Sequence, residues 1–316
     1  MKHVVSLILL GALVALLAAT GLARAEDISL RVGDQKAGLK ALLEVSGLAK
    51  DLPYKVRWSE FPAAAPILEA LNTGALDVGY TGDLAFLTVY SAGAPIRAIG
   101  GTRSAARSQA ILVPKDSPAR TIADLKGKRL AGNKGGWGQF LILAVLEQAG
   151  IPADQVKWSY LGPIDARAAL LSGAVDGWAI WEPYVSTAIM QDDARVIADG
   201  TGLTPTITFL VASQEAIASR YAALADFRRR LYAAWAWGLK HIPEYAAYNA
   251  GLTGLPAPIV ARAYEDDHRT PLAIDDAVIA EVQQAADRST RYGILPRRVD
   301  VAAAIDRSFD TPALSQ

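Results

Sequence analysis

The residues that could do chemistry are concentrated in LAGNKGGWGQF, residues 130–140, between an apolar run and a predicted helix. Its glycines let backbone N–H groups approach a ligand closely. A helix that begins there contributes roughly half a positive charge, and Lys134 adds a full one. The stretch matches neither G-x-x-x-x-G-K-[ST] nor G-x-G-x-x-G, so it gives no support for nucleotide binding. It favours an anion-binding turn, the alternative being a tight connection with Lys134 in solvent.

The sequence contains two similar units. LEALNTGALDVGYTGD, residues 68–83, matches RAALLSGAVDGWAIWE, residues 167–182, at a constant offset of 99. GDQKAG at 33–38 lies opposite GNKGGW at 132–137 at the same offset, and KVRWSEFP matches KWSYLGP at an offset of 100. The longest match pairs Gly74 with Gly173, Asp77 with Asp176, and Asp83 with Glu182. Unrelated strand–helix stretches also share weak patterns, but the near-constant offset favours a structural repeat.

Each unit is expected to form strand, helix, strand, helix and strand. The predicted elements of the first unit are residues 28–33, 39–50, 55–60, 64–73 and 76–80. Those of the second are residues 129–132, 139–149, 156–160, 166–172 and 174–180. Alternating strands and helices predict an α/β fold with parallel sheets and right-handed crossovers. Ligand-facing loops then lie beyond the carboxyl ends of the strands, which places the glycine-rich turn on the ligand side.

The other loops at this edge supply further candidate residues. By topology they are Asp34, Gln35, Lys36, Phe61, Pro62, Thr81, Gly82, Asp83, Arg103, Ser104, Gly162, Pro163, Asp165, Trp181 and Glu182. The acids Asp83 and Glu182 need an explanation if the ligand is an anion. They either cap the next helices, accept hydrogen bonds from a ligand amine or hydroxyl, or hold Lys134 and Arg103 in position. A solvated Arg103 is also compatible with the sequence.

Four stretches together resemble the aliphatic-sulfonate-binding proteins, the solute receptors of a family of ABC importers. They are VGDQKAG, EFPAAAPILEALNTGALDVGYTGD, AILVPKDSPARTIADLKGKRLAGNKG and LGPIDARAALLSGAVDGWAIWEPY. The resemblance implies a two-lobed type II periplasmic binding protein fold, each lobe a mostly parallel sheet flanked by helices. It also implies that the chain captures a small organic sulfonate between the lobes for sulfur acquisition. The partners implied are the importer's membrane permease with its ATPase.

The resemblance assigns ligand contacts position by position. It places them at Gln35, Thr81, Gly82, Asp83, Asn133, Lys134, Gly135, Asp165, Trp181 and Glu182. The chain departs from the usual sulfonate pattern at Gly136 and Trp137, where relatives carry small polar residues. This exchange removes side-chain donors and adds an aromatic face, which suits a larger or aromatic sulfonate. Because relatives include receptors for taurine, nitrate and thiamine precursors, these ligands stay as alternatives.

The first 25 residues are typical of a secretory signal peptide. Lys2 precedes an apolar stretch at 4–19, and Ala23-Arg24-Ala25 forms an A-x-A site, so we expect cleavage after Ala25. An uncleaved membrane anchor is the alternative. Removing Lys2 and Arg24 from the 32 basic residues leaves 30 against 32 acidic ones, a formal charge near −2 that gives no case for nucleic-acid binding. With no cysteine for a lipid anchor, we expect a free, monomeric periplasmic protein.

Topology and resemblance together predict the lobes. The first part of lobe 1 is residues 26–108, lobe 2 is 109–211, and 212–316 complete lobe 1 and form the C-terminal helices. Two strands that cross between the lobes would act as the hinge. The segment FRRRLYAAWAWGLKHI has an apolar helical stripe, so its tryptophans are expected to pack in the core rather than against ligand.

An exported enzyme of the same fold is the rival class. The mature chain holds only His241 and His268, with no H-E-x-x-H, no G-x-S-x-G and no cysteine. EDDH at 265–268 looks superficially like a metal cluster, but we expect it to be solvated in the helical tail. The cysteine-rich segment and histidine of the related enzymes of thiamine precursor synthesis are also missing. The sequence therefore predicts a receptor without catalysis, cofactor or metal.

Overall fold

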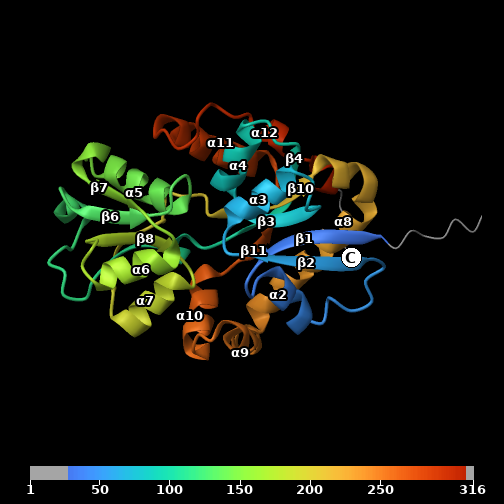
Figure 1. The fold of residues 1–316 in the computed structure, drawn as a ribbon, viewed down its shortest axis with the longest axis horizontal. Coiled ribbons are helices and arrows are strands. Elements are labelled where there is room, and N and C mark those ends of the chain that lie inside the picture. Colours follow the sequence, from blue (N-terminus) through green and yellow to red (C-terminus); the bar gives the residue numbers. More distant parts are fainter. Residues whose placement is uncertain (1–27, 311–316) are drawn as a thin grey trace, which may run out of the picture.

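Two β-sheets, each flanked by helices, make up the structure, a computed structural model that describes residues 28–310 (Figure 1). The first sheet has the strand order β11-β4-β10-β3-β1-β2, and the second has the order β7-β6-β8-β5-β9. We call each sheet with its helices a lobe. The α/β class with two lobes is therefore confirmed, whereas the predicted signal peptide lies outside the described residues.

The strands have the following bounds. The first sheet contains β1 (Ser29–Gln35), β2 (Lys55–Phe61), β3 (Val78–Gly82), β4 (Ile96–Arg103), β10 (Ile207–Ser213) and β11 (Thr270–Leu272). The second sheet contains β5 (Gln109–Val113), β6 (Arg129–Gly132), β7 (Lys157–Tyr160), β8 (Gly177–Trp181) and β9 (Arg195–Asp199). The chain thus passes from the first sheet to the second after β4 and returns before β10. The residue limits of the lobes stay a prediction.

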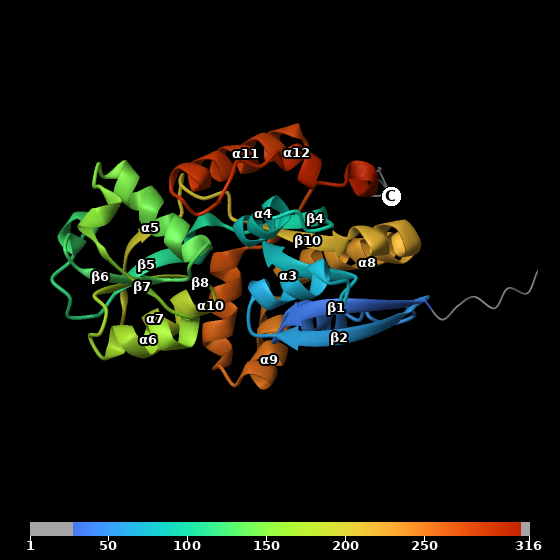
Figure 2. The same ribbon diagram turned by 45° about the horizontal axis from the view of Figure 1, so that its top comes forward.

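Helices cover both faces of each sheet, and apolar side chains bury the contacts. In the first lobe, one face packs against α3 (Ala64–Asn72), α4 (Asp83–Ser91), α11 (Asp276–Arg291) and α12 (Val301–Ala304), and the other against α2 (Leu39–Val45), α8 (Gln214–Lys240) and α9 (Ile242–Thr253). In the second, α5 (Trp137–Gln148) covers one face, and α6 (Pro163–Leu171) and α7 (Tyr184–Asp192) cover the other. Helix α10 (Ala257–Asp267) stands between the lobes and contacts α7 (Figure 2). Short 3-10 helices span Ala106–Ser108, Ile122–Leu125, Ala153–Gln155 and Arg307–Asp310.

The ten elements predicted for the two units are present, with ends that differ by a few residues. The largest difference is the helix expected at 39–50, which ends at Val45. Gly47 adopts a left-handed conformation (φ +74°), which ends the helix at low cost because glycine has no Cβ. The tryptophan interpretation is confirmed for Trp235, which is buried beside Tyr80 and Tyr232.

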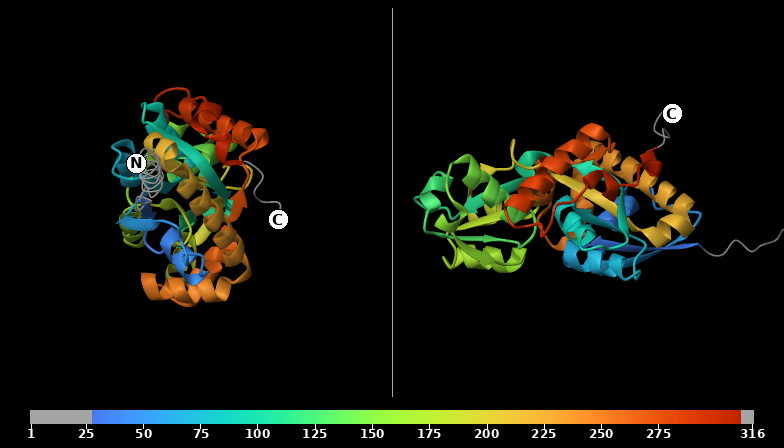
Figure 3. Two further views of the ribbon diagram at one scale, coloured as in Figure 1. Left: turned by 90° about the vertical axis from the view of Figure 1, so that its right-hand side faces the viewer. Right: turned by 90° about the horizontal axis from the view of Figure 1, so that it is seen from above.

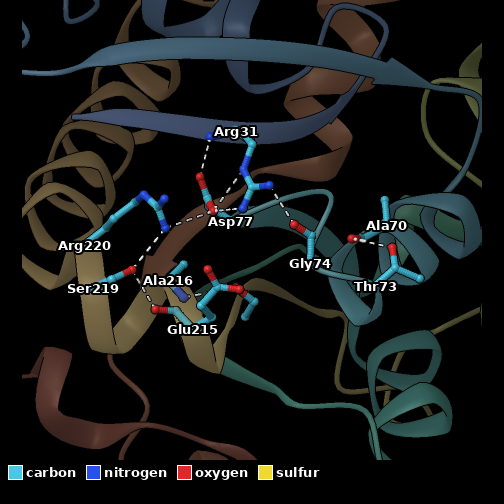
Figure 4. A network of polar contacts seen from close by, with 10 residues as sticks. Arg31, Ala70, Thr73, Gly74, Asp77, Glu215, Ala216, Ser219 and Arg220 are labelled. Carbon is cyan, nitrogen blue, oxygen red and sulfur yellow. Dashed lines mark hydrogen bonds and ion pairs between the residues drawn. The ribbon is translucent and has the colours of Figure 1, made fainter. Parts of the chain in front are cut away.

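The internal repeat is visible in the hydrogen bonds at the start of each lobe. In the first lobe, the Arg31 N–H donates to Asp77 Oδ2 (2.8 Å) and its guanidinium donates to the carbonyl of Gly74 (2.7 Å) (Figure 4). The same pattern recurs in the second lobe, where the Arg129 N–H donates to Asp176 Oδ2 (2.8 Å) and its guanidinium to Gly173 (2.9 Å). Both glycines have positive φ, near +70°. In each unit, the recurrent Gly and Asp therefore hold the first strand against the turn that precedes the third strand.

The two copies of this contact differ in burial. Asp77 is fully buried and also lies 3.5 Å from the guanidinium of Arg220, whereas the Asp176 side chain is 33% exposed (Figure 4). Removing one partner of a buried ion pair leaves the other charge uncompensated. The first copy should therefore contribute more to stability.

We expect Asp77→Ala to lower the free energy of unfolding by about 3 kcal/mol, and Asp176→Ala by about 1 kcal/mol. Urea unfolding followed by tryptophan fluorescence measures both. Equal losses for the two variants would show that burial does not separate the two contacts.

Candidate functional site

The glycine-rich turn of the second lobe is folded around one side chain. Asn133, directly after β6, accepts a hydrogen bond from the Gly138 N–H through Oδ1 (2.8 Å), and Gln139 accepts one from the Gly135 N–H (2.8 Å). A Cβ at Gly136 would lie 2.0 Å from Asn133 Nδ2, and one at Gly138 would lie 2.8 Å from Asn133 Oδ1. The glycines are thus required by the fold of the turn itself.

The first lobe has the same turn at the expected position. Asp34, 99 residues before Asn133, accepts hydrogen bonds from the N–H groups of Gln35, Leu39 and Lys40 (2.8–2.9 Å). A Cβ at Gly38 would lie 2.3 Å from Asp34 Oδ1. Burial raises the pKa of Asp34, although the backbone donors act in the opposite direction. The turn leaves the side chains of Gln35 and Lys36 exposed.

Predicted ligand loops from the two lobes meet directly. The indole of Trp137, at the start of α5, lies against Gly82 at the end of β3, where a Cβ would come within 2.7 Å of its Nε1. Gly82 therefore has to be a glycine for this contact to form. Gly82, between Thr81 and Asp83, therefore lies beside the start of α5, and the assignment of these three residues to a ligand site stays a prediction.

Helix α5 is also held by the first lobe beyond its first turn. Its Phe140 packs with Leu84, Ala285 and Ile294 in a cluster that both lobes supply. Near its end, Glu147 accepts hydrogen bonds from the Tyr292 hydroxyl and from Arg288 Nη2 (2.8 Å). Figure 3 shows α11 reaching toward the second lobe. Arg288 lies in the last turn of this helix, and Tyr292 directly follows it. The turn and its helix are therefore fixed relative to the first lobe.

The two acids of the predicted site accept hydrogen bonds from backbone N–H groups in the first turns of the following helices. Asp83 is fully buried, and its Oδ1 accepts a hydrogen bond from the Leu84 N–H (2.6 Å). Glu182 accepts hydrogen bonds from the Ser186 N–H (3.0 Å) and Ser186 Oγ (2.9 Å) at the start of α7. Burial raises the pKa of Asp83 to about 8 and that of Glu182 to about 7. Burial thus shifts both carboxyls toward their neutral forms.

Two buried polar atoms beside these loops lack a partner among residues 28–310. They are Thr81 Oγ1 and Asp83 Oδ2. A third, Gln109 Oε1, belongs to the strand that follows the crossing from the first lobe. Buried polar atoms are nearly always paired with protein or with a bound molecule. These atoms are therefore available to a ligand or to water.

Of the remaining predicted residues, Lys134, Asp165 and Trp181 form no ion pair within residues 28–310, whereas Arg103 does. Lys134 is exposed, and its Nζ lies 5.7 Å from the ring centroid of Tyr160, at the end of β7. Asp165 is exposed in the first turn of α6, and Trp181 is half-buried with its ring edge against Tyr184. Within residues 28–310, the charged groups of Lys134 and Asp165 form no ion pair. The indole of Trp181 contacts Tyr184 edge to face.

Arg103 differs from the others because its guanidinium is already engaged. Both terminal nitrogens donate to the carboxylate of Glu281 in α11 (2.7 and 2.6 Å), and Nη1 also donates to the carbonyl of Pro205. The alternative that acids of the cleft hold Arg103 is wrong, because Glu281 lies outside the predicted loops. The alternative of a purely solvated Arg103 is not what the structure shows, because the guanidinium is paired with Glu281, although its side chain is 34% exposed.

A second guanidinium, which the sequence did not single out, lies beside the first-lobe loops. Arg269 donates to Asp267 (2.8 Å) and to the hydroxyl of Tyr80 (2.6 Å), the residue before Thr81. The prediction that EDDH at 265–268 is solvated is wrong for Asp267, which is buried, whereas Asp266 forms an ion pair with Arg107 at the surface. No motif marks Arg269, so only the folded chain could reveal it.

Two structural findings bear on other functions. Among residues 28–310, no cluster of three or more His, Asp or Glu side chains is arranged to hold a metal ion. No helix in that part of the chain is long and apolar enough to cross a membrane. The predicted lack of a cofactor stays a prediction.

Comparison with known proteins identifies relatives over the whole chain. The NMT1/THI5-like family matches residues 55–246. A protein of Escherichia coli (strain K12) named "Putative aliphatic sulfonates-binding protein" is 36% identical over 314 residues, which cover 96% of this chain and 97% of that protein.

Solved structures agree with this result. The periplasmic aliphatic sulphonate binding protein SsuA of Escherichia coli has a TM-score of 0.82 at 35% identity, over 90% of this chain and 99% of that one. The alkanesulfonate-binding protein SsuA of Xanthomonas axonopodis pv. citri, solved bound to MOPS, has a TM-score of 0.81 at 34% identity, over 89% and 99%. The desulfurization enzyme DszB, at 15% identity and a TM-score of 0.67, shares the fold alone.

The buried carboxyl of Asp83 should make the free energy of unfolding depend on pH. Its pKa rises from 3.8 to about 8 on folding, so over this range the unfolded chain loses a proton that the folded chain keeps. The free energy of unfolding should therefore fall as pH rises, by up to about 1.4 kcal/mol per pH unit. Asp83→Asn, which mimics the neutral form, should flatten this dependence in urea unfolding between pH 5 and about 8.

The exposed Asp165 provides the matched control, because Asp165→Asn should keep the wild-type slope. If Asp83→Asn also keeps that slope, Asp83 is charged in the folded protein.

Proposed function

The chain belongs to the NMT1/THI5-like family, together with the aliphatic-sulfonate-binding proteins, and from this premise we propose that it is a periplasmic receptor for organic sulfonates. In this proposal the ligand binds between the lobes without being chemically changed. The receptor then delivers it to the membrane permease of an ABC importer. Export after cleavage at Ala25 and a monomeric state are parts of the same proposal.

One observation carries the proposal: the paired turns at Asp34 and Asn133, and the meeting of the Asn133 turn with the opposite lobe. Each turn follows the first strand of its unit, and its Asp34 or Asn133 side chain accepts a hydrogen bond from an N–H group at the start of the next helix. Helix α5 adds the partial positive charge of its amino end. Trp137, at that end, touches Gly82 of the other lobe. A sulfonate at this contact would be reached from both lobes.

The state of the acids supports an anionic ligand. A fully ionised Asp83 or Glu182 would repel a sulfonate, but burial raises the pKa of each carboxyl to about 8 and about 7. A protonated Asp83 Oδ2 can also donate a hydrogen bond to a sulfonate oxygen. The alternative that these acids serve a ligand amine is not needed, because both already accept N–H hydrogen bonds at helix starts.

The aromatic residues around the turn favour a ligand larger than methanesulfonate. Trp137 stands where the resemblance implies small polar residues, and Tyr160 stacks on Trp158 with ring centroids 5.8 Å apart. These rings provide apolar surface next to Lys134. Apolar contact contributes roughly 25 cal/mol per Å² buried, so affinity should increase with the size of the organic group.

Titration calorimetry in a phosphate buffer free of sulfonates tests the function. We expect binding of butanesulfonate and benzenesulfonate to be tighter than that of methanesulfonate, with taurine and nitrate as comparison ligands. The absence of heat for every sulfonate would contradict the proposed function. Tighter binding of nitrate or taurine would keep the receptor but change its ligand.

Lys134→Ala tests whether the lysine contributes to anion binding. We expect affinity for butanesulfonate to fall by about 1–3 kcal/mol, the range for a charge-assisted hydrogen bond. The thermal stability without ligand should hardly change, because Lys134 is exposed. Lys157→Ala, at the other end of β7, is the matched control. If the two variants bind butanesulfonate equally tightly, Lys134 does not contribute to binding.

A further inference from the structure

A surface cavity lies at the end of the first lobe opposite the ligand loops. It has a volume of about 470 Å³ and is formed by the end of α4, the turn into β4, the first residue of α8 and the segment after α11. Arg97 marks its position at the amino end of β4, whereas the ligand loops follow the carboxyl ends of the strands. This cavity, which we call the distal cavity, is therefore separate from the site proposed above.

The lining of the distal cavity is positively charged. It contains three arginines, Arg97, Arg297 and Arg298, and one acid, Asp300. The carboxylate of Asp300 accepts a hydrogen bond from the Ala303 N–H (3.3 Å) and so caps α12. Three arginines thus line the cavity, and its one carboxylate is already hydrogen-bonded to a backbone N–H group.

Arg97 is held in place at the wall. Its guanidinium lies over the ring of Tyr90, 5.2 Å from the centroid, and Nη1 donates to the carbonyl of Ile96 (2.8 Å). In the amide orientation that satisfies both side chains, Gln214 Oε1 accepts from Nη1 and Nη2 (3.0 and 2.8 Å). None of these partners is charged, so the positive charge of Arg97 stays uncompensated within its contacts.

The other two arginines are available for binding. Both are exposed. Arg298 pairs with Asp287 (3.2 Å), but its side chain is 79% exposed, and such pairs contribute little. Arg297 forms no ion pair or side-chain hydrogen bond with other residues of the described chain, 28–310. A ligand could therefore recruit Arg297 and Arg298 toward the fixed Arg97.

We propose that the distal cavity is a second binding site, for a small molecule with a multivalent phosphate or carboxylate group. Guanidinium groups bind such oxyanions through paired, charge-assisted hydrogen bonds. The volume lies within the range of small-molecule sites, and it exceeds what a single inorganic ion needs. The turn residues Gly93 and Pro95 provide the remaining wall.

Calorimetry with inorganic pyrophosphate and with citrate, in Tris chloride without sulfonate, tests this proposal. We expect at least one of the two probes to bind the wild type. Arg297→Ala combined with Arg298→Ala should weaken that binding about tenfold or more. Because both arginines are exposed, the double variant should fold normally, and its affinity for butanesulfonate should match the wild type.

Arg57→Ala is the charge-matched control, since Arg57 is exposed on β2, away from the distal cavity. Its affinity for the probe should stay within about twofold of the wild type. No binding of either probe at millimolar concentration would overturn the proposal. An equal loss of probe affinity in Arg57→Ala would also overturn it, because the probe would then respond to the overall charge of the protein. A loss of probe affinity in Lys134→Ala would overturn it as well, because the probe would then bind at the sulfonate site.

Discussion

A short polar side chain that folds a glycine-containing turn around itself is the contact on which the rest of this structure depends. Asn133 does this in the second lobe and Asp34 in the first, each through an N–H group five residues later. Neighbouring glycines are required, because a Cβ at Gly38 or Gly136 would overlap the side chain. In the second lobe, the turn places the amino end of α5 against Gly82 of the first lobe. The proposed site thereby relies on this helix end, rather than on a cluster of charged side chains, to attract an anion.

The second constraint is that carboxyl groups lie where an anion is expected to bind. The protein resolves this conflict by burial and not by removing the acids. Asp83 and Glu182 keep their hydrogen bonds to the first turns of α4 and α7, while desolvation favours their neutral forms. Charged arginines nearby are committed to other partners, Arg103 to Glu281 and Arg269 to Asp267. Lys134 is then the exposed cation of the glycine-rich turn.

Much of this organisation could be predicted from sequence, because it is encoded locally or by repetition. Alternating strands and helices, the offset of 99 and the glycine spacing predicted the two lobes and the loops that carry Thr81, Gly82 and Trp137. The role of Arg103 could not be predicted, because its partner Glu281 is 178 residues away. Arg269 was missed because its contact with Tyr80 spans 189 residues, and Asp267 was expected to be solvated. Their contacts depend on how the C-terminal helices return to the first sheet, which no periodicity or motif records.

In the proposed complex, one sulfonate group is held by backbone N–H groups of both lobes at the contact of Trp137 with Gly82. A crystal structure with butanesulfonate bound would reveal these contacts. We expect sulfonate oxygens within hydrogen-bond distance of N–H groups in the turn at 132–138 and of residues 81–83. A sulfonate bound to one lobe alone, or away from both loops, would contradict it.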